Sequence, residues 1–234
     1  MLQQVLRKSA LYFYISNQVL PSGSMSMAFS TCKRLFCFAL VLAFATIRIV
    51  TAGDEDILSD FVVAPNFTVD DSYFTLTNLR AVVGAPPPTI FKVSKASLAE
   101  FPALAGQSVS YAILQYPAGS INPPHTHPRS AELLFLLGGA LEVGFIDTTN
   151  KLFTQVLQTG DLFVFPKGLV HYQFNSDANS SATAISAFGS VNAGTISVPT
   201  TVFATNIDDA ILAKSFKTDV ATIQKLKAGL SLKA

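Results

Sequence analysis

Short β-type segments separated by turn residues fill the second half of this 234-residue chain. Eight such runs follow Ser108, each five to eight residues long: VSYAILQY, ELLFLL, ALEVGFI, FTQVLQ, DLFVFP, VHYQF, ATAISAF and ISVPTTVF. Strands at this spacing, with Gly, Pro, Asn and Asp between them, are typical of an all-β sandwich or barrel. Half of the residues are apolar and only 13% are charged, so the chain can fill the interior of such a fold.

The carboxyl-terminal segment, residues 205–234, changes to a helical period. Its apolar residues recur at steps of three and four: Ile207, Ile211, Leu212, Phe216, Val220, Ile223 and Leu226. Asp208 near the start and Lys227 near the end have the charges that a helix dipole favours. We therefore expect a β-barrel core over residues 107–204 and two short helices after it.

Residues 53–106 have a different composition, with acidic turns and a GAPPP breaker at Gly84 to Pro88. Few long periodic runs occur there, which predicts an N-terminal arm with short strands. We expect this arm to fold with the core and the helices as one domain, residues 53–234.

The first 52 residues have the features of an N-terminal extension followed by a signal peptide. Lys33 and Arg34 precede an apolar run over residues 35–47, LFCFALVLAFATI. This length fits the hydrophobic region of a signal and is shorter than the roughly 20 residues that span a bilayer. We expect cleavage before Gly53, which predicts a secreted, extracellular chain with no membrane span.

Removal of residues 1–52 changes the charge of the chain. That segment holds five of the 16 basic residues and none of the 15 acidic ones, so the remainder has a net charge of about minus four. This balance argues against a basic surface for nucleic acid. Cys32 and Cys37 both lie in the signal, which leaves the secreted chain without a disulfide. Asn66 and Asn179 begin glycosylation sequons.

The three histidines of the chain lie in two strand motifs framed by Gly and Pro. His125 and His127 are two positions apart, so a strand places both imidazoles on one face. Glu132 follows a break at Pro128 and begins the next strand, which can return a carboxylate to the same point. His171 supplies a third imidazole from a later strand.

Three imidazole nitrogens and one carboxylate oxygen leave open positions on a six-coordinate metal. This donor set favours manganese or iron over a closed structural zinc site, although zinc remains an alternative. A single buried histidine is more often a hydrogen-bonded core residue than a metal ligand. Here every histidine falls in such a motif with a carboxylate nearby, which favours a metal centre.

The spacing of the two motifs resembles a known pair. The motifs are Gly119-x5-His125-x-His127-x4-Glu132-x6-Gly139 and Gly160-x5-Pro166-x-Gly168-x2-His171-x3-Asn175. Together they resemble the paired motifs of plant germin-like proteins, which are members of the cupin superfamily. The resemblance covers essentially all of residues 53–234.

This resemblance implies a jelly-roll β-barrel in a secreted, apoplastic glycoprotein. It implies that manganese is held by the residues matching His125, His127, Glu132 and His171. It also implies dimers joined through β surfaces and carboxyl-terminal helices, assembled as a hexamer that is a trimer of dimers. Roles in the cell wall and in stress or defence are typical of such proteins.

The resemblance also bears on oxalate as a substrate. In oxalate-oxidising germins two asparagines face the metal; Asn122 matches one of them, and Ala112 stands in place of the other. Because a methyl group cannot donate a hydrogen bond to oxalate, oxalate oxidase activity is disfavoured. The alternative for Asn122 is that Asn-Pro-Pro only forms a turn.

Two functions remain open from the sequence. The first is a superoxide dismutase-type enzyme with a small anionic substrate, toward which Arg129 or Lys167 would attract the anion, unless both are ordinary solvated loop charges. The second is a non-enzymatic binding, structural or storage module that is stabilised by its metal and binds a small carboxylate or an auxin-like ligand. The apolar residues Phe135, Leu137, Phe163 and Phe165 would line a pocket or only a core.

Overall fold

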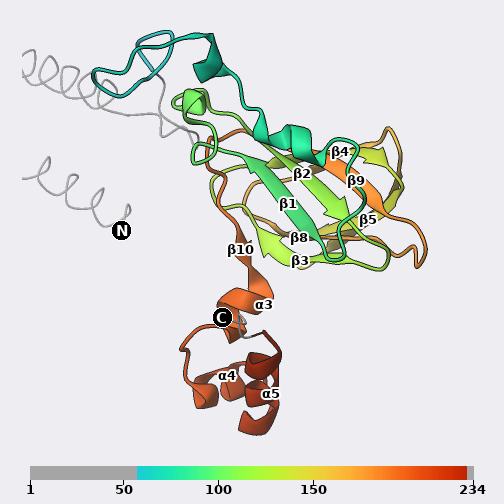
Figure 1. Ribbon diagram of the computed structural model, residues 1–234. Coiled ribbons are helices and arrows are strands. Elements are labelled where there is room, and N and C mark those ends of the chain that lie inside the picture. The colour runs from blue at the N-terminus through green and yellow to red at the C-terminus, as the bar shows by residue number, and fades with distance from the viewer. Residues whose placement is uncertain (1–56, 231–234) are drawn as a thin grey trace, which may run out of the picture. The chain divides into compact units, whose positions relative to one another are not determined.

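Two five-stranded antiparallel sheets form the centre of the chain in the computed structural model, which describes residues 57–230 (Figure 1). The signal peptide predicted within residues 1–52 lies outside the described residues. The strands are β1 (Lys92–Ala96), β2 (Ser110–Tyr116), β3 (Ile121–Thr126), β4 (Glu132–Gly138), β5 (Ala140–Ile146), β6 (Leu152–Gln158), β7 (Leu162–Phe165), β8 (Val170–Phe174), β9 (Ala182–Phe188) and β10 (Ile196–Ser197).

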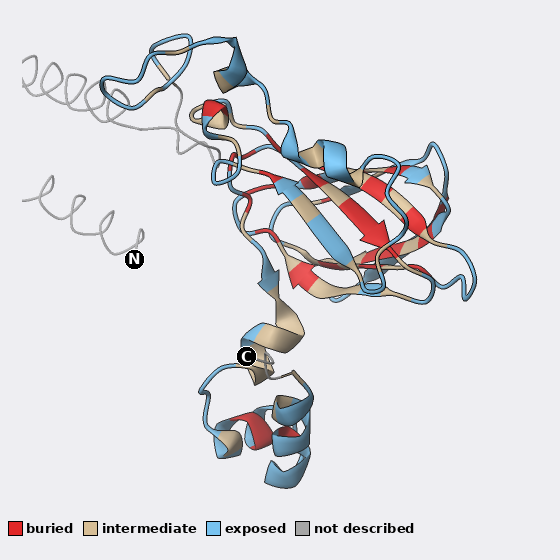
Figure 2. Cartoon of the chain, viewed as in Figure 1, coloured by how far each residue is buried: buried red, intermediate tan, exposed pale blue. Residues whose placement is uncertain are grey.

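The strand order shows that distant parts of the chain are neighbours in both sheets. One sheet has the order β1-β2-β9-β4-β7, and the other has the order β10-β3-β8-β5-β6. The prediction of an all-β core followed by helices is confirmed, because every strand pair is antiparallel and all of the later helices follow β10. The inner faces of the strands carry most of the buried residues (Figure 2).

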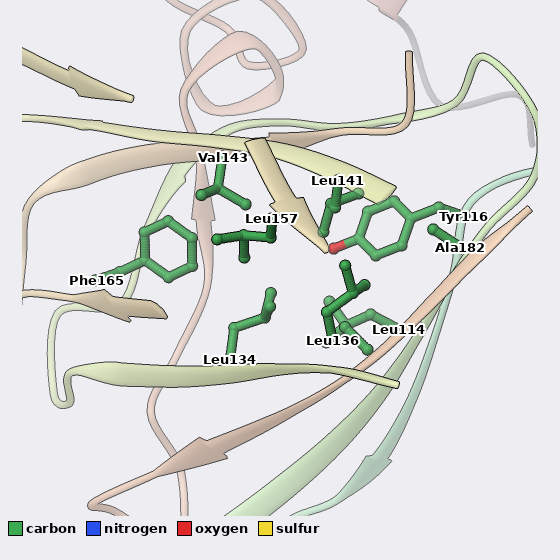
Figure 3. Packing of buried hydrophobic residues seen from close by; sticks show 10 residues of the cluster. Leu114, Tyr116, Leu134, Leu136, Leu141, Val143, Leu157, Phe165 and Ala182 are labelled. Carbon is green, nitrogen blue, oxygen red and sulfur yellow. The ribbon is translucent and has the colours of Figure 1, made fainter. Parts of the chain in front are cut away.

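A hydrophobic core fills the space between the sheets (Figure 3). Its buried members are Leu114, Tyr116, Leu134, Leu136, Leu141, Val143, Leu157, Phe165, Ala182 and Ala184. Each large apolar side chain that leaves water here stabilises the fold by about 1.5–3 kcal/mol. The described residues contain no cysteine, so this part of the chain is held by packing and hydrogen bonds.

Strand β4 shows which of its apolar residues face the core. Glu132, Leu134 and Leu136 are each no more than 1% exposed, whereas Leu137 is 45% exposed. Because side chains alternate along a strand, an inward Glu132 forces Phe135 and Leu137 onto the outer face. The expectation that Leu137 would line a pocket or the core is therefore wrong.

The run ISVPTTVF is another place where the sequence interpretation fails. Only Ile196–Ser197 pairs as a strand, and Val198–Phe203 forms the helix α3. Pro199 lies in the first turn of this helix, where its missing N–H and fixed φ angle are tolerated. The same proline could not donate to a strand ladder, so the extended run ends before it.

Two further helices, α4 (Asp209–Ser215) and α5 (Val220–Leu230), complete the described chain. The carboxylate of Asp208 caps α4 by accepting hydrogen bonds from the backbone N–H groups of Ala210 and Ile211, at 2.9 and 3.1 Å. Leu212 and Ile223 are buried between the helices. Within residues 57–230 no helix is both long and apolar enough to cross a lipid bilayer.

The segment before β2 consists mainly of turns. It contains three 3-10 helices, η1 (Asp71–Phe74), η2 (Asn78–Val82) and η3 (Pro102–Leu104), together with the edge strand β1. Strand β1 pairs with β2, and this pairing places Lys95 opposite Ala112.

Candidate metal centre

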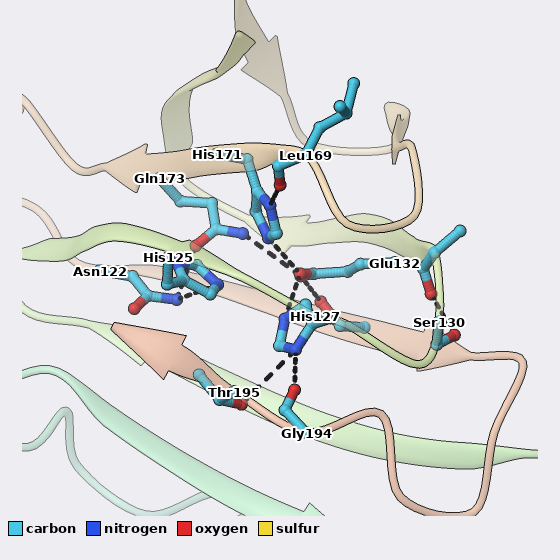
Figure 4. A network of polar contacts seen from close by, with 12 residues as sticks. Asn122, His125, His127, Ser130, Glu132, Leu169, His171, Gln173, Gly194 and Thr195 are labelled. Carbon is cyan, nitrogen blue, oxygen red and sulfur yellow. Dashed lines mark hydrogen bonds and ion pairs between the residues drawn. The ribbon is translucent and has the colours of Figure 1, made fainter. Parts of the chain in front are cut away.

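Three strands bring the four predicted metal ligands together inside the sandwich (Figure 4). His125 lies on β3 directly opposite His171 on β8, and His127 follows the end of β3. Glu132 is the first residue of β4, as its position after the Pro128 break predicts. All four side chains are buried, with exposed fractions of 1–6%.

Each histidine ring is oriented by a backbone carbonyl. The Nδ1 atoms of His125 and His171 donate to the carbonyl oxygens of Pro123 and Leu169, both at 2.8 Å. The Nδ1 atom of His127 donates to the carbonyl oxygen of Gly194. Because a carbonyl oxygen can only accept, each Nδ1 carries the hydrogen and each neutral ring keeps its lone pair on Nε2.

These lone pairs converge on Glu132. Its Oε2 atom lies 3.1 Å from the Nε2 atoms of both His127 and His171. One ligand atom from each of the four residues can be chosen so that all lie within 4.8 Å of one another. Two neutral Nε2 atoms and a carboxylate oxygen at such distances have no hydrogen between them, so a positive charge is needed to hold them together.

A transition-metal ion fits this requirement better than protons do. Three imidazoles crowded into one buried site disfavour protonation of more than one ring, because their charges would repel one another. One cation held by these four residues would satisfy the imidazole lone pairs and the carboxylate charge together, and the Nδ1–carbonyl bonds are the usual outer support of such ligands. The donor set is therefore suited to a metal ion.

The titration of two ligands agrees with this description. Burial, together with the nearby His171, lowers the pKa of His125 to about 4, so this ring is neutral at physiological pH. Burial alone would raise the pKa of Glu132, but the close approach of the His127 and His171 rings outweighs it and holds that pKa well below its usual value. Both groups are thus in the ionisation state that a metal requires.

A buried chain of polar side chains supports Glu132 from behind. Its Oε1 atom accepts hydrogen bonds from the hydroxyl of Ser186 at 2.5 Å and from Nε2 of Gln173 at 3.3 Å. The Oε1 atom of Gln173 in turn accepts from Nδ2 of Asn122 at 2.7 Å. The same Nδ2 atom of Asn122 lies 3.5 Å from Nε2 of His125, so Asn122 is beside the metal site as predicted.

Aromatic rings close two sides of the centre. Phe165 stacks on His171 with ring centroids 4.5 Å apart, and Phe188 meets the His127 ring edge-on at 4.9 Å. Phe165 is fully buried and Phe163 packs beside it against the core. Phe165 therefore belongs to the core, whereas Phe163 packs against the core and also lines a separate pocket beside β6.

The remaining side opens into a cavity of about 360 Å³. Three ligands, His125, His127 and Glu132, reach its wall, as do Asn122 and Ala112. Small molecules can therefore reach the metal ligands from this side.

The cations near the cavity differ from those expected. Arg129 donates from Nε to the carbonyl oxygen of Asn192 at 2.5 Å and from Nη2 to its Oδ1 at 2.8 Å, so it braces a loop. Neither Arg129 nor Lys167 lines the cavity, whereas Lys95 does. The prediction that Arg129 or Lys167 guides an anion to the ligands is not supported by these positions.

Several supporting residues were not anticipated from the sequence. The sequence could have indicated Gln173, because this residue lies two positions after His171 on the same face of the strand. Ser186, Gly194 and Lys95 had none, because their places depend on how distant strands and loops pair.

Comparison with known proteins assigns the family. The Cupin family model matches residues 86–224. Germin-like protein 9-3 of Oryza sativa subsp. japonica is 60% identical over 207 residues, which cover 84% of this chain and 95% of that protein. The chain belongs to the germin-like proteins of the cupin family. Germin-like protein subfamily 2 member 2 of Arabidopsis thaliana is 37% identical and covers 83% and 97% of the two chains.

Solved structures agree with this germin-like assignment. An oxalate oxidase structure is 30% identical, with a TM-score of 0.68, over 76% of this chain and 98% of that chain. A complex of oxalate oxidase with the substrate analogue glycolate is 28% identical, with a TM-score of 0.67 and the same coverage. This germin-like protein is thus a cupin β-sandwich with C-terminal helices and a buried His/His/Glu/His metal site.

Proposed function

We propose that this germin-like protein is a secreted manganese protein with superoxide dismutase-type activity in the apoplast. The observation that carries the proposal is a His/His/Glu/His set that is buried on three sides and open to a cavity on the fourth. Manganese bound there would supply a redox centre that alternates between two oxidation states. Iron and zinc are the other metals that these ligands would accept.

The residues of the chain would each have a defined task in this activity. The three backbone carbonyls fix the imidazoles, and Glu132 supplies the one anionic donor. Ser186 and Gln173 hold the carboxylate of Glu132 in place, so a bound metal would meet a preorganised ligand. Asn122 donates one amide hydrogen to Gln173, and its Nδ2 atom also lies 3.5 Å from Nε2 of His125, which would place the amide beside a small anion in the cavity.

Oxalate is a less suitable substrate for this site, although oxalate oxidases are among the structures that resemble the chain. Ala112 lines the cavity at the place where the resemblance to oxalate-oxidising germins calls for an asparagine. A methyl group there offers no hydrogen bond to a carboxylate oxygen. Superoxide, which has only two atoms, depends less on such a contact.

A second function is favoured by the size of the cavity. A volume of about 360 Å³ is much larger than superoxide needs and falls in the range of small-molecule pockets. A metal-stabilised binding or storage module for a small carboxylate would use the same ligands without turnover. Both functions use the same metal site, but only the superoxide dismutase-type enzyme would turn over a substrate.

Secretion and glycosylation belong to the same proposal. Asn66 and Asn179, which begin the two sequons, are both exposed. Mass spectrometry of the protein from plant cell-wall fluid would give a mature amino terminus at Gly53 and glycans at one or both asparagines. An amino terminus that retains the apolar run 35–47 would contradict secretion by signal cleavage.

We also propose that the protein assembles with itself as a trimer of dimers. Apolar side chains remain exposed on the outer face of β4 and β7 and on the terminal helices: Leu133, Leu162, Val164, Ile211, Phe216 and Leu226. Such exposed side chains favour burial against further copies. Light scattering after size exclusion would then give six times the chain mass, and a monomer at micromolar concentration would contradict the assembly.

The activity is tested by superoxide removal with manganese-loaded protein freed of unbound metal. We expect removal by the wild type and by Glu142→Gln, and its loss together with the metal in Glu132→Gln. Glu142 is the matched control because it lies on β5, is not one of the four metal ligands, and its carboxylate accepts a hydrogen bond from the hydroxyl of Tyr172 at 3.0 Å. Full metal occupancy without superoxide removal would contradict the enzymatic function and leave the binding module as the function.

A further inference from the structure

We propose that the pocket beside β6 is a second binding site of this protein, separate from the metal centre, and that it binds a neutral phenolic ring. None of the four candidate metal ligands lines this pocket. The inference therefore goes beyond the proposed function and does not depend on it.

The pocket lies where both sheets end. Strand β6 is the last strand of one sheet and β7 is the last strand of the other, and residues of both strands line the pocket. Because neither sheet continues, inward-facing side chains at these edges stay partly uncovered, and Phe153 is 36% exposed. The pocket has a volume of about 480 Å³, which falls in the range of small-molecule sites.

Strand register gives the pocket an apolar floor. Phe145 on β5 is the cross-strand partner of Phe153 on β6, and the two rings stack with centroids 5.0 Å apart. Leu157 points to the same face of β6 and is 2% exposed. The ring of Phe163 on β7 lies 6.2 Å from that of Phe145. These rings offer a further aromatic ring the edge-to-face and offset contacts that it prefers.

Two polar side chains of the pocket match a hydroxyl group. The Oδ2 atom of Asp161 accepts from the backbone N–H of Gln158 at 2.8 Å, and its Oδ1 atom has no hydrogen-bond partner in the described part of the chain. The Oε1 atom of Gln155 accepts from the backbone N–H of Val156 at 3.1 Å, so its Nε2 atom is left as a donor. A phenol can donate to Asp161 and accept from Gln155, whereas a hydrocarbon can do neither.

The charges around the pocket disfavour ionic ligands of either sign. Asp161 is the one charged residue among the described residues that line it, and its carboxylate repels an organic acid. Lys151 places its Nζ atom 4.6 Å from the centroid of the Phe153 ring, so a second cation at the pocket would meet a like charge. A neutral ring meets neither repulsion.

A buried aromatic ring separates the pocket from the metal centre. Phe165 is fully buried, and its ring centroid lies 5.0 Å from that of Phe163 and 4.5 Å from that of His171. Binding in the pocket should therefore require neither the metal nor its ligands. This independence allows the two sites to be tested separately.

The test is titration calorimetry of the manganese-loaded protein with p-cresol. Toluene lacks the hydroxyl group, p-toluate is an anion and benzylamine is a cation. In Asp161→Asn the single side-chain oxygen stays with the N–H of Gln158, so an amide nitrogen replaces the free acceptor. Gln155→Trp covers the pocket with a large side chain. Asp71→Asn is the matched control, because Asp71 is exposed on η1 and does not line the pocket.

We expect p-cresol to bind the wild type roughly threefold to tenfold more tightly than toluene, p-toluate or benzylamine. Asp161→Asn should weaken p-cresol binding by a similar factor and leave toluene unchanged, and Gln155→Trp should abolish binding of both. Asp71→Asn should bind p-cresol as the wild type does. So should Ala112→Leu, which fills the metal cavity, and Glu132→Gln, which removes a metal ligand.

Circular dichroism identifies a variant that does not fold, and the other pocket variant then decides the result. The site would be overturned by the absence of saturable p-cresol binding, by tighter binding of either ion, or by wild-type binding in folded Asp161→Asn or Gln155→Trp. Loss of p-cresol binding in folded Ala112→Leu would place the ligand in the metal cavity and overturn it as well. A wild type that binds p-cresol but holds no manganese would contradict the proposed function alone.

Discussion

The ring of His127 donates from Nδ1 to the carbonyl oxygen of Gly194, a residue 67 positions further along the chain. Gly194 has a φ angle of +71°, and Arg129 holds the same loop through Asn192. One metal ligand is therefore oriented by a loop from the end of the sandwich, which the ligand motifs do not include. Changes in that loop should act on the metal.

Gly194→Ala tests this link. A Cβ atom there would lie 2.8 Å from Nη2 of Arg129, and the positive φ angle adds backbone strain. We expect the loop to shift, and manganese affinity to fall about tenfold, which metal competition would measure. Gly84→Ala is the control, because Gly84 has a φ angle of +74° and no atom near the added Cβ. Equal manganese affinity in both variants would contradict the link.

Gln173→Leu tests the support of Glu132. The change removes the donor to Oε1 of Glu132 and the acceptor for Asn122 while it keeps the size of the side chain. We expect manganese affinity to fall by about 10- to 100-fold. Gln155→Leu serves as the control because Gln155 is exposed on β6. Wild-type affinity in Gln173→Leu would show that Ser186 alone is sufficient.

The stability of the metal-free protein should fall in acid. The pKa of His125 drops from 6.5 to about 4 on folding, so between these values the unfolded chain binds more protons than the folded one. Stability from this group is complete above pH 6.5 and declines as the pH falls toward 4. The decline should be roughly 1 kcal/mol per pH unit in urea unfolding.

Glu132 acts in the same direction at lower pH. Its folded pKa is depressed, so its contribution is present above about pH 4.5 and is lost as the pH falls further. His125→Gln is the informative comparison between pH 6.5 and 4.5. In that variant the free energy of unfolding should change less steeply with pH. An unchanged pH dependence would refute the assignment to His125.

Ala112→Asn tests why oxalate is disfavoured. The added amide would face the cavity and supply the hydrogen bond that the methyl group lacks. We expect peroxide release from oxalate only in this variant, and not in the wild type or in Ala112→Leu, which has a similar volume and no donor. Clear peroxide release by the wild type would show that the argument from Ala112 is wrong.

The sequence predicts the ligand set better than its surroundings for a physical reason. Strand alternation relates His125 to His127 and also His171 to Gln173, so local spacing is enough for these residues. The position of Lys95 instead depends on the register of β1 against β2, which no local spacing encodes.

Local patterns also fail where they allow more than one structure. ELLFLL is apolar on both faces, so alternation alone could not decide that Leu136 faces the core and Leu137 faces outward. The run before Phe203 has β-branched residues that suit a strand, and Pro199 nonetheless starts a helix there. Tertiary packing and one proline decide these cases.

The central claim is that His125, His127, Glu132 and His171 hold one transition-metal ion. Elemental analysis of the protein from its native tissue, and of recombinant Glu132→Gln and Glu142→Gln, tests it most directly. We predict about one manganese ion per chain in the native protein and in Glu142→Gln, and almost none in Glu132→Gln. Native protein free of any transition metal, or full occupancy in Glu132→Gln, would contradict the claim.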